Sequence, residues 1–141
     1  MSEQDVAVIR EQFEAVNDRK FEHAMAIYSD DVVLVVPGSG VKAGRFEGKE
    51  AVGEWFGDWF RAFAPDYRFE ITEANALDSG TILLVARHWG KGRMSGAQVE
   101  DENGYLYRVR DGKVSQVGFF ETREEAIEAA ALPEWSEAKT D

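Results

Sequence analysis

The chain has 141 residues, with 27 acidic against 16 basic side chains and no cysteine, which suits one domain that buries a core without disulfides. A net charge of −11 repels phosphate backbones and anionic lipid, so binding to nucleic acid or to a membrane surface is not expected. No apolar run approaches the roughly 20 residues of a membrane span, and no apolar leader follows Met1. The sequence therefore predicts a soluble, cytoplasmic protein.

Apolar residues recur at helical spacing in the first part of the chain and predict two helices. The first helix is expected from Ser2 to about Val16, with one apolar face toward the core. Polar residues 17–20 break the pattern, and a shorter second helix ends at Tyr28. Residues 32–36 are apolar and mostly β-branched, which predicts a strand that is buried on both faces.

A concentration of large rings follows a glycine-rich loop that ends at Gly48. Residues 49–64 predict a helix, and nine consecutive positions within it carry five rings: Trp55, Phe56, Trp59, Phe60 and Phe63. Four of these rings lie on one helical stripe, and Trp55 lies at its edge. We expect this helix to form the wall of a wide apolar space, while ordinary core packing is the alternative explanation of the same pattern.

The remaining chain alternates with the period of a sheet and predicts four antiparallel strands, at residues 67–77, 81–89, 97–109 and 113–121. Asp111-Gly112 is a strong hairpin signal between the last two. Asn103-Gly104 has the same form, but the stretch before it is short and acidic, so we interpret it as a bulge within one long strand. Glycine-rich residues 90–96 predict a hairpin connection rather than a phosphate-binding loop.

The end of the chain predicts one more helix and a tail. Thr122 and Glu125 have the spacing of a capping box, which opens an alanine-rich helix that continues to about Ala131. The polar residues after this helix have no periodic pattern. We therefore expect residues 1–133 to form a single domain and residues 134–141 to form a flexible C-terminal tail.

Four motifs in this order of elements resemble the nuclear transport factor 2-like superfamily, and within it the SnoaL-like and ketosteroid isomerase-like branch. They are AIYSDDV at residues 26–32, GRFEGKEAV at 44–52, RDGKV at 110–114 and FFETREEA at 119–126. The resemblance implies an α+β fold, a cystatin-like α+β barrel, in which a cone-like curved antiparallel sheet wraps around the N-terminal and central helices. It also implies a homodimer that forms through the outer face of the sheet. The superfamily contains enzymes, carriers and non-catalytic partners, so the resemblance does not fix the function.

Ketosteroid isomerases use a carboxylate base together with an oxyanion hole made of a tyrosine and a protonated aspartate. The resemblance places the base at Val36, the oxyanion tyrosine near Phe13 and the second donor near Tyr105. A valine cannot transfer a proton, so these residues argue against steroid isomerisation by that machinery.

Glu121 is the first candidate for a catalytic residue. Val117, Phe119 and Glu121 share one strand face, which the family pattern points into the cone. A carboxyl group beside phenyl rings would have a raised pKa and could act as a general acid or base. The alternative is a solvated carboxylate at the end of its strand.

His88 and Tyr105 are the other two candidates for catalysis. His88 shares a strand face with Ala86, whereas Arg87 and Trp89 share the opposite face, and the sequence does not say which face points inward. An inward His88 would be a proton carrier near neutral pH, and an outward one would lie on the surface or in an interface. Tyr105 could donate a hydrogen bond to a ligand oxygen, while core or dimer packing is its alternative role.

The remaining candidates would bind a ligand through aromatic rings, and they are Phe13, Tyr28, Trp55, Trp59, Phe63, Tyr107 and Phe119. The sequence has no metal-binding motif and indicates no cofactor. We expect a homodimer that binds a small apolar or aromatic ligand. Two functions stay open: an enzyme of the isomerase or cyclase type that uses proton transfer, and a non-catalytic module with a vestigial pocket. An open cavity would favour the first, and an interior filled by Trp55, Trp59 and Tyr105 the second.

Overall fold

The computed structural model describes residues 2–38, 43–63, 65–77, 80–132 and 135. In chain order the elements are α1 (Ser2–Asn17), α2 (Phe21–Ala26), β1 (Tyr28–Val36), β2 (Gly44–Glu47), α3 (Lys49–Arg61), β3 (Arg68–Ala76), β4 (Ile82–Lys91), β5 (Gln98–Arg110), β6 (Lys113–Phe120) and α4 (Arg123–Ala130). Among these residues, no helix is long and apolar enough to cross a membrane.

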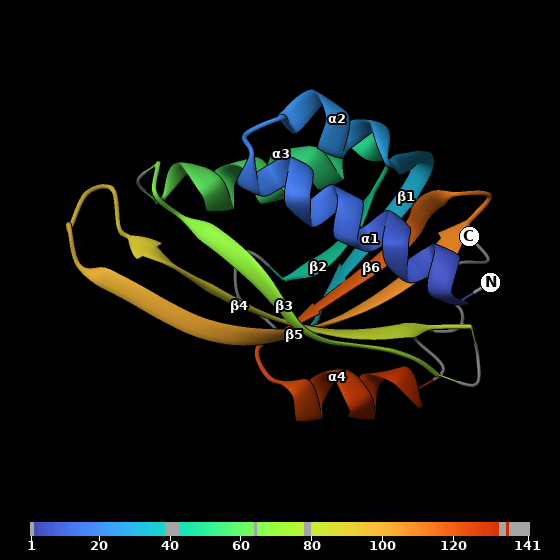
Figure 1. Ribbon diagram of the computed structural model, residues 1–141. Coiled ribbons are helices and arrows are strands. Elements are labelled where there is room, and N and C mark those ends of the chain that lie inside the picture. The colour runs from blue at the N-terminus through green and yellow to red at the C-terminus, as the bar shows by residue number, and fades with distance from the viewer. Residues whose placement is uncertain (1, 39–42, 64, 78–79, 133–134, 136–141) are drawn as a thin grey trace.

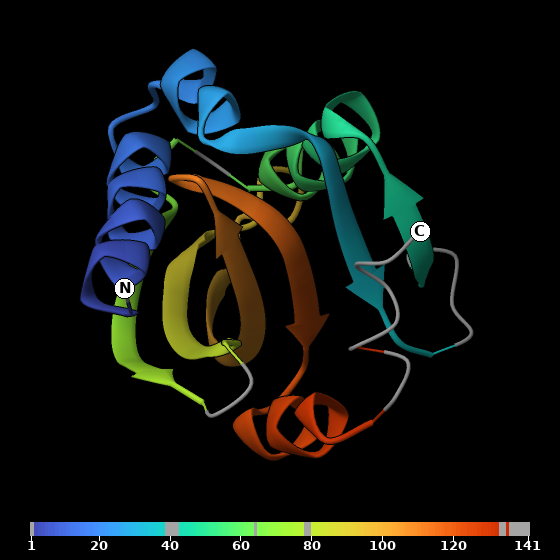
Figure 2. The same ribbon diagram turned by 90° about the vertical axis from the view of Figure 1, so that its right-hand side faces the viewer.

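One six-stranded sheet in the order β2-β1-β6-β5-β4-β3 forms the centre of the protein. The sheet is strongly curved, with α1, α2 and α3 on its concave side and α4 on the opposite side (Figures 1 and 2). This arrangement confirms the predicted α+β fold with a curved sheet around the N-terminal and central helices. The sheet is not wholly antiparallel, because β1 and β6 pair in parallel.

The alternation of side chains along β4 decides which residues face each side of the sheet. Ile82, Leu84 and Ala86 belong to the large hydrophobic cluster beneath the three helices. Leu83 points the other way and belongs to the smaller cluster under α4. His88 follows Ala86 at the same two-residue spacing and is 4% exposed. The structure therefore settles the orientation that the sequence left open, since His88 faces inward.

β2 and the start of β1 lie where the sequence analysis expected other structure. β2 pairs antiparallel with the end of β1, but it has only four residues, lies between Gly44 and Gly48, and has one partner strand. β1 begins at Tyr28 rather than at Val32. The polar residues 29–31 predict the end of a helix, but in the structure they belong to β1. The pairing of β1 with β6 is irregular between Tyr28 and Val33.

The expected bulge at Asn103-Gly104 is wrong. Both residues pair in unbroken register with β4, and the irregularity of β5 lies instead between Arg108 and Val109 on its β6 side. Gly104 serves the packing of α4, because a Cβ there would lie 2.6 Å from the carbonyl oxygen of Thr122. The N-cap half of the predicted capping box of α4 is confirmed, since the Thr122 hydroxyl accepts from the Glu125 N–H at 3.1 Å, whereas the Glu125 carboxylate accepts from the Glu121 N–H.

Trp135 lies in the segment that we expected to be a flexible tail. The expectation is wrong at this residue, because Trp135 is packed against the sheet. Its indole is 2% exposed and packs on the outer side of the sheet with α4. The indole N–H donates to the Thr81 hydroxyl at 2.9 Å, and the Trp135 carbonyl accepts from the Gln116 amide at 2.9 Å. The other residues of that segment lie outside the described part of the chain.

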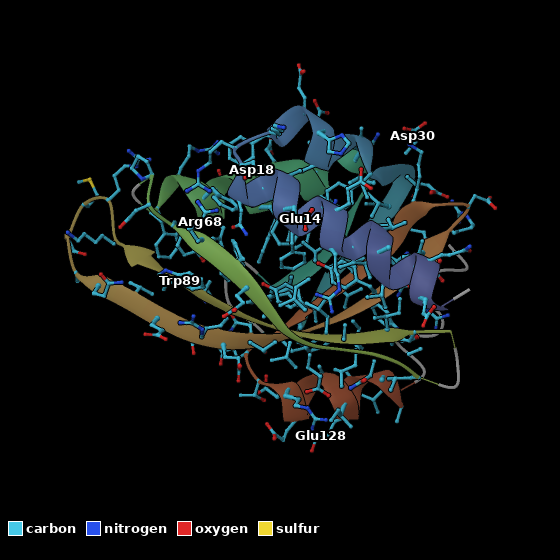
Figure 3. All side chains as sticks on the ribbon, in the orientation of Figure 1. Glu14, Asp18, Asp30, Arg68, Trp89 and Glu128 are labelled. Carbon is cyan, nitrogen blue, oxygen red and sulfur yellow. The ribbon has the colours of Figure 1, made fainter. Side chains whose placement is uncertain are left out.

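The outer face of the sheet is where the family resemblance places a dimer interface. α4 and Trp135 cover the part of this face formed by Leu83, Leu106 and Phe120. Figure 3 shows Glu128 of α4 on this side of the sheet, away from Glu14 and Asp18 of α1. A homodimer would use the part of the outer face that α4 leaves uncovered, and it stays a prediction.

Candidate functional site

Two of the cavities formed by the described residues bear on function, and the first lies between the helical layer and the sheet. We call it the helix-side cavity, and its volume is about 340 Å³. Its walls come from α1, α2, α3, β3 and β5 and are mostly rings and aliphatic side chains. The lining residues are Gln12, Phe13, Val16, Phe21, Ala24, Met25, Tyr28, Gly53, Phe56, Gly57, Phe60, Arg61, Phe69, Tyr105 and Tyr107.

The second cavity has a volume of about 690 Å³, and we call it the strand-end cavity. Because β1 and β6 are parallel, their carboxyl ends meet at the same edge of the sheet, and the cavity lies there between α3 and α4. Its lining combines rings with carboxylates. The lining residues are Val36, Pro37, Gly38, Ala43, Trp55, Trp59, Phe119, Phe120, Glu121, Glu125, Glu128, Ala129 and Leu132.

The ring of Phe119 lies between the two cavities. Its centroid is 5.4 Å from that of Tyr105 in the helix-side cavity, and 5.7 Å and 4.9 Å from those of Trp55 and Trp59 in the strand-end cavity. The interior is therefore neither one open cone nor a solid core. Phe119 and the rings around it fill its middle and leave space on both sides.

Three tyrosines contribute hydroxyl groups to the helix-side cavity, which is also lined by the polar side chains of Gln12 and Arg61. Tyr28, Tyr105 and Tyr107 are 8%, 3% and 4% exposed. Among the described residues, none of their hydroxyl groups has a hydrogen-bond partner. Burial raises the pKa of all three phenols above the ordinary value. The hydroxyls therefore stay protonated at physiological pH and can donate hydrogen bonds to a guest.

Local structure dictates how these tyrosines meet. Tyr105 and Tyr107 are two residues apart on β5, so their side chains leave the same face of the strand. Their rings stack with centroids 6.0 Å apart and an interplanar angle of 23°. Phe13 of α1 packs edge-on against both, at 5.9 Å and 6.4 Å. Tyr28 joins them from the first residue of β1, and the pKa of Tyr107 is raised further by its charge interaction with Tyr28.

A chain of hydrogen bonds, partly buried at Trp59 and buried at His88, connects α3 to β4. The Trp59 indole N–H donates to the Tyr67 hydroxyl oxygen at 2.6 Å, and the Tyr67 oxygen lies 2.7 Å from His88 Nδ1. An indole nitrogen only donates, so the Tyr67 hydrogen is free to point at His88. Nδ1 is then the acceptor, and the proton of the neutral imidazole is on Nε2.

His88 is neutral in the folded protein and lies in a cluster of rings. Burial lowers its pKa, while the Asn103 amide and the Asp101 charge act in the opposite direction. Asn103 Oδ1 is itself buried without a partner among the described residues. Tyr67 is fully buried, yet it is not among the candidate site residues. The sequence predicts it only as the first residue of a strand, and β3 begins one residue later, at Arg68.

The three candidate catalytic residues do not meet in one place. Tyr105 lines the helix-side cavity and Glu121 the strand-end cavity, whereas His88 lines neither. Glu121 is exposed just beyond β6, not among the rings of the cone, and its N–H donates to a Glu125 carboxylate oxygen at 3.2 Å. Their roles in proton transfer stay predictions.

The predicted ligand-binding rings divide between the two cavities, and one lies outside both. Phe13, Tyr28 and Tyr107 line the helix-side cavity, while Trp55, Trp59 and Phe119 line the strand-end cavity. Phe63 instead stacks on Tyr67 with centroids 4.0 Å apart. In the described part of the chain, no group of three or more histidines and carboxylates is placed to hold a metal ion.

Residues 9–117 match the profile of the SnoaL-like domain family. The protein belongs to this family. Bal32a from a soil-derived mobile gene cassette is a similar solved structure, with a TM-score of 0.72, 17% identity, and coverage of 84% of this chain and 88% of Bal32a. No curated protein sequence matches the chain.

Two similar structures contain small molecules. Rv0760c from Mycobacterium tuberculosis, in complex with estradiol-17β-hemisuccinate, has a TM-score of 0.69 and 20% identity, over 82% of this chain and 92% of Rv0760c. TerC, co-crystallised with polyporic acid, has a TM-score of 0.70 and 16% identity, over 89% of this chain and 96% of TerC. At these identities the likeness shows the fold that this SnoaL-like protein shares with them.

In this SnoaL-like protein, Phe119 divides the positions at which the resemblance would place the ketosteroid isomerase machinery. Val36, at the position of the base, lines the strand-end cavity. Phe13 and Tyr105, at the positions of the two oxyanion donors, line the helix-side cavity. Of the two expected oxyanion donors, only Tyr105 has a hydroxyl group. At the expected position of the base, Val36 has no titratable group.

Proposed function

We propose that this SnoaL-like protein binds a small ring-containing molecule in the helix-side cavity and holds an oxygen atom of that molecule with its buried tyrosines. The observation that supports this proposal is the set of three hydroxyls without partners in an apolar cavity. A volume of about 340 Å³ is within the range of small-molecule sites. Rings and aliphatic groups supply the apolar walls that such a ligand needs.

The energetics of the hydroxyl groups favour a guest with hydrogen-bonding atoms. The hydroxyl oxygens of Tyr28, Tyr105 and Tyr107 are not among the fully buried side-chain atoms of the described residues that lack a partner, so they are open to the cavity. Phenylalanine at these positions would fill nearly the same space but would offer a guest no hydrogen bond. A guest oxygen that accepts from these hydroxyls would form its hydrogen bonds in a place where water competes poorly.

Binding is better supported than proton transfer in this cavity. Among its described lining residues there is no carboxylate and no histidine, and phenols with raised pKa values do not act as bases near neutral pH. An isomerase or cyclase reaction would need a base such as Glu121, which lies on the other side of Phe119. The small molecules in Rv0760c and TerC support a ligand-binding role for the fold.

The tyrosine hydroxyls should contribute measurably to affinity. We expect 2-naphthol to bind the wild-type protein and to bind a Tyr105→Phe, Tyr107→Phe double variant about 10- to 100-fold more weakly, since two hydrogen bonds of about 1 kcal/mol each are lost. Isothermal titration calorimetry at pH 7 measures both affinities.

Naphthalene, which lacks the hydroxyl group, is the matched control ligand. Its affinity should be nearly equal for the wild type and the double variant, because phenylalanine preserves the walls. Equal affinity of 2-naphthol for the two proteins would remove the tyrosines from the site, and no binding of either probe would reject the cavity as a ligand site.

A further inference from the structure

Among the described residues that line the helix-side cavity, one side chain carries a full charge. This side chain is Arg61, the last residue of α3. Its side chain is 70% exposed, so it lies at the mouth of the cavity rather than in its depth. A ligand that reaches the tyrosines through this mouth would pass the guanidinium group.

Gly57 lies one turn before Arg61 on α3, and both residues line the cavity. A Cβ atom at Gly57 would lie 3.4 Å from Nη1 of Arg61, an ordinary van der Waals distance. The guanidinium group therefore lies along the helix beside the cavity.

The present partner of Arg61 is easily exchanged. Its guanidinium pairs with Asp58, three residues earlier on the same helix, and the Asp58 side chain is 50% exposed. Exposed pairs of this kind contribute little to stability because water solvates both charges. A planar carboxylate on a ligand could accept two parallel hydrogen bonds from the guanidinium and compete with Asp58.

Other arginines add positive charge to this end of the protein, although the chain as a whole carries −11. Arg93 donates to the carbonyl of Arg61 at 3.2 Å. Arg19 donates to the carbonyl of Tyr67 at 2.5 Å. The pKa of Arg19 is lowered first by burial and second by the nearby positive charge of Arg68. Figure 3 shows Arg68 on β3 near the end of the helical layer. Asp66 also acts on Arg19 and Asp58 pairs with Arg61, so at this end of the protein the arginines offset nearby carboxylates.

We propose that the ligand of the helix-side cavity is an apolar acid whose carboxylate pairs with Arg61 at the mouth. Its rings lie among the phenyl groups, and its far oxygen reaches the buried tyrosines. This inference rests on the proposed function and adds the chemical class of the ligand.

A matched pair of probes tests the charge. 6-Hydroxy-2-naphthoate and 6-hydroxy-2-naphthamide have nearly the same shape and differ by one negative charge. Calorimetry at pH 7 should show that the acid binds the wild type about tenfold more tightly than the amide, as a charge-assisted pair is stronger than a neutral one. Arg61→Gln should lose that preference and leave the affinity for the amide unchanged.

Arg10→Gln is the matched control, because Arg10 is exposed on α1, lines neither cavity and changes the net charge equally. It should keep the preference for the acid. Equal binding of the two probes to the wild type would overturn the inference. An equal loss of the preference for the acid in Arg61→Gln and in Arg10→Gln would overturn it too. Either result would leave the proposed function standing, whereas failure of both probes to bind would reject the proposed function itself.

Discussion

Replacing Trp135 with alanine is expected to lower the free energy of unfolding by about 3–5 kcal/mol, the usual cost of removing a buried tryptophan. The indole is 2% exposed, donates to the Thr81 hydroxyl, and lies under the Arg108 guanidinium at 5.6 Å. Its loss leaves a cavity between α4 and the sheet and removes the hydrogen bond from the indole to the Thr81 hydroxyl. Urea unfolding followed by far-ultraviolet circular dichroism measures the change without relying on tryptophan fluorescence.

Leu132→Ala is the control for this experiment, since Leu132 lies three residues earlier and is 50% exposed. An exposed side chain of this kind should change the free energy of unfolding by about 1 kcal/mol or less. If Trp135→Ala lowers the free energy of unfolding no more than Leu132→Ala does, then Trp135 does not anchor α4. The expectation of a flexible C-terminal tail would then stand.

Tyr67→Phe is expected to lower the free energy of unfolding by about 2–4 kcal/mol. The change removes one oxygen atom, but it leaves both the Trp59 N–H and His88 Nδ1 without their partner. Each buried group left unpaired costs about 1–3 kcal/mol. The same urea titration gives the value, and the stacked Phe63 ring keeps the remaining phenyl ring in place.

The control for Tyr67→Phe is Tyr28→Phe. Both tyrosine side chains are buried, but the Tyr28 hydroxyl has no hydrogen-bond partner among the described residues. Its removal should be nearly neutral or slightly stabilising. Similar losses in the two variants would mean that the Trp59–Tyr67–His88 chain contributes no more than an isolated phenol does.

Much of the fold could be predicted because its elements have strong local signals. Period-two alternation identified β3 to β6, and Asp111-Gly112 identified the turn between the last two strands. Thr122 and Glu125 fixed the start of α4. β2 has no comparable signal, since a four-residue strand between glycines is defined by its partner β1 and not by its own pattern.

The site could be predicted only in part, because it depends on how rings from distant elements pack. Strand alternation placed Val117 and Phe119 on one face of β6, and the family resemblance correctly pointed that face inward. It could not show that the Phe119 ring would meet Tyr105 and the two tryptophans of α3 and so divide the space. The position of Trp135 had one usable signal, because a tryptophan in a polar segment is rarely left exposed.

The most direct test of the proposed site uses the methyl groups of methionine. The chain has three methionines: Met25 lines the helix-side cavity, and Met94 is 97% exposed. In protein labelled with ¹³C at these methyl groups, saturating 2-naphthol should shift the Met25 signal and give intermolecular nuclear Overhauser effects to it, with Met94 unchanged. An unchanged Met25 signal at saturating 2-naphthol would contradict a ligand site in the helix-side cavity.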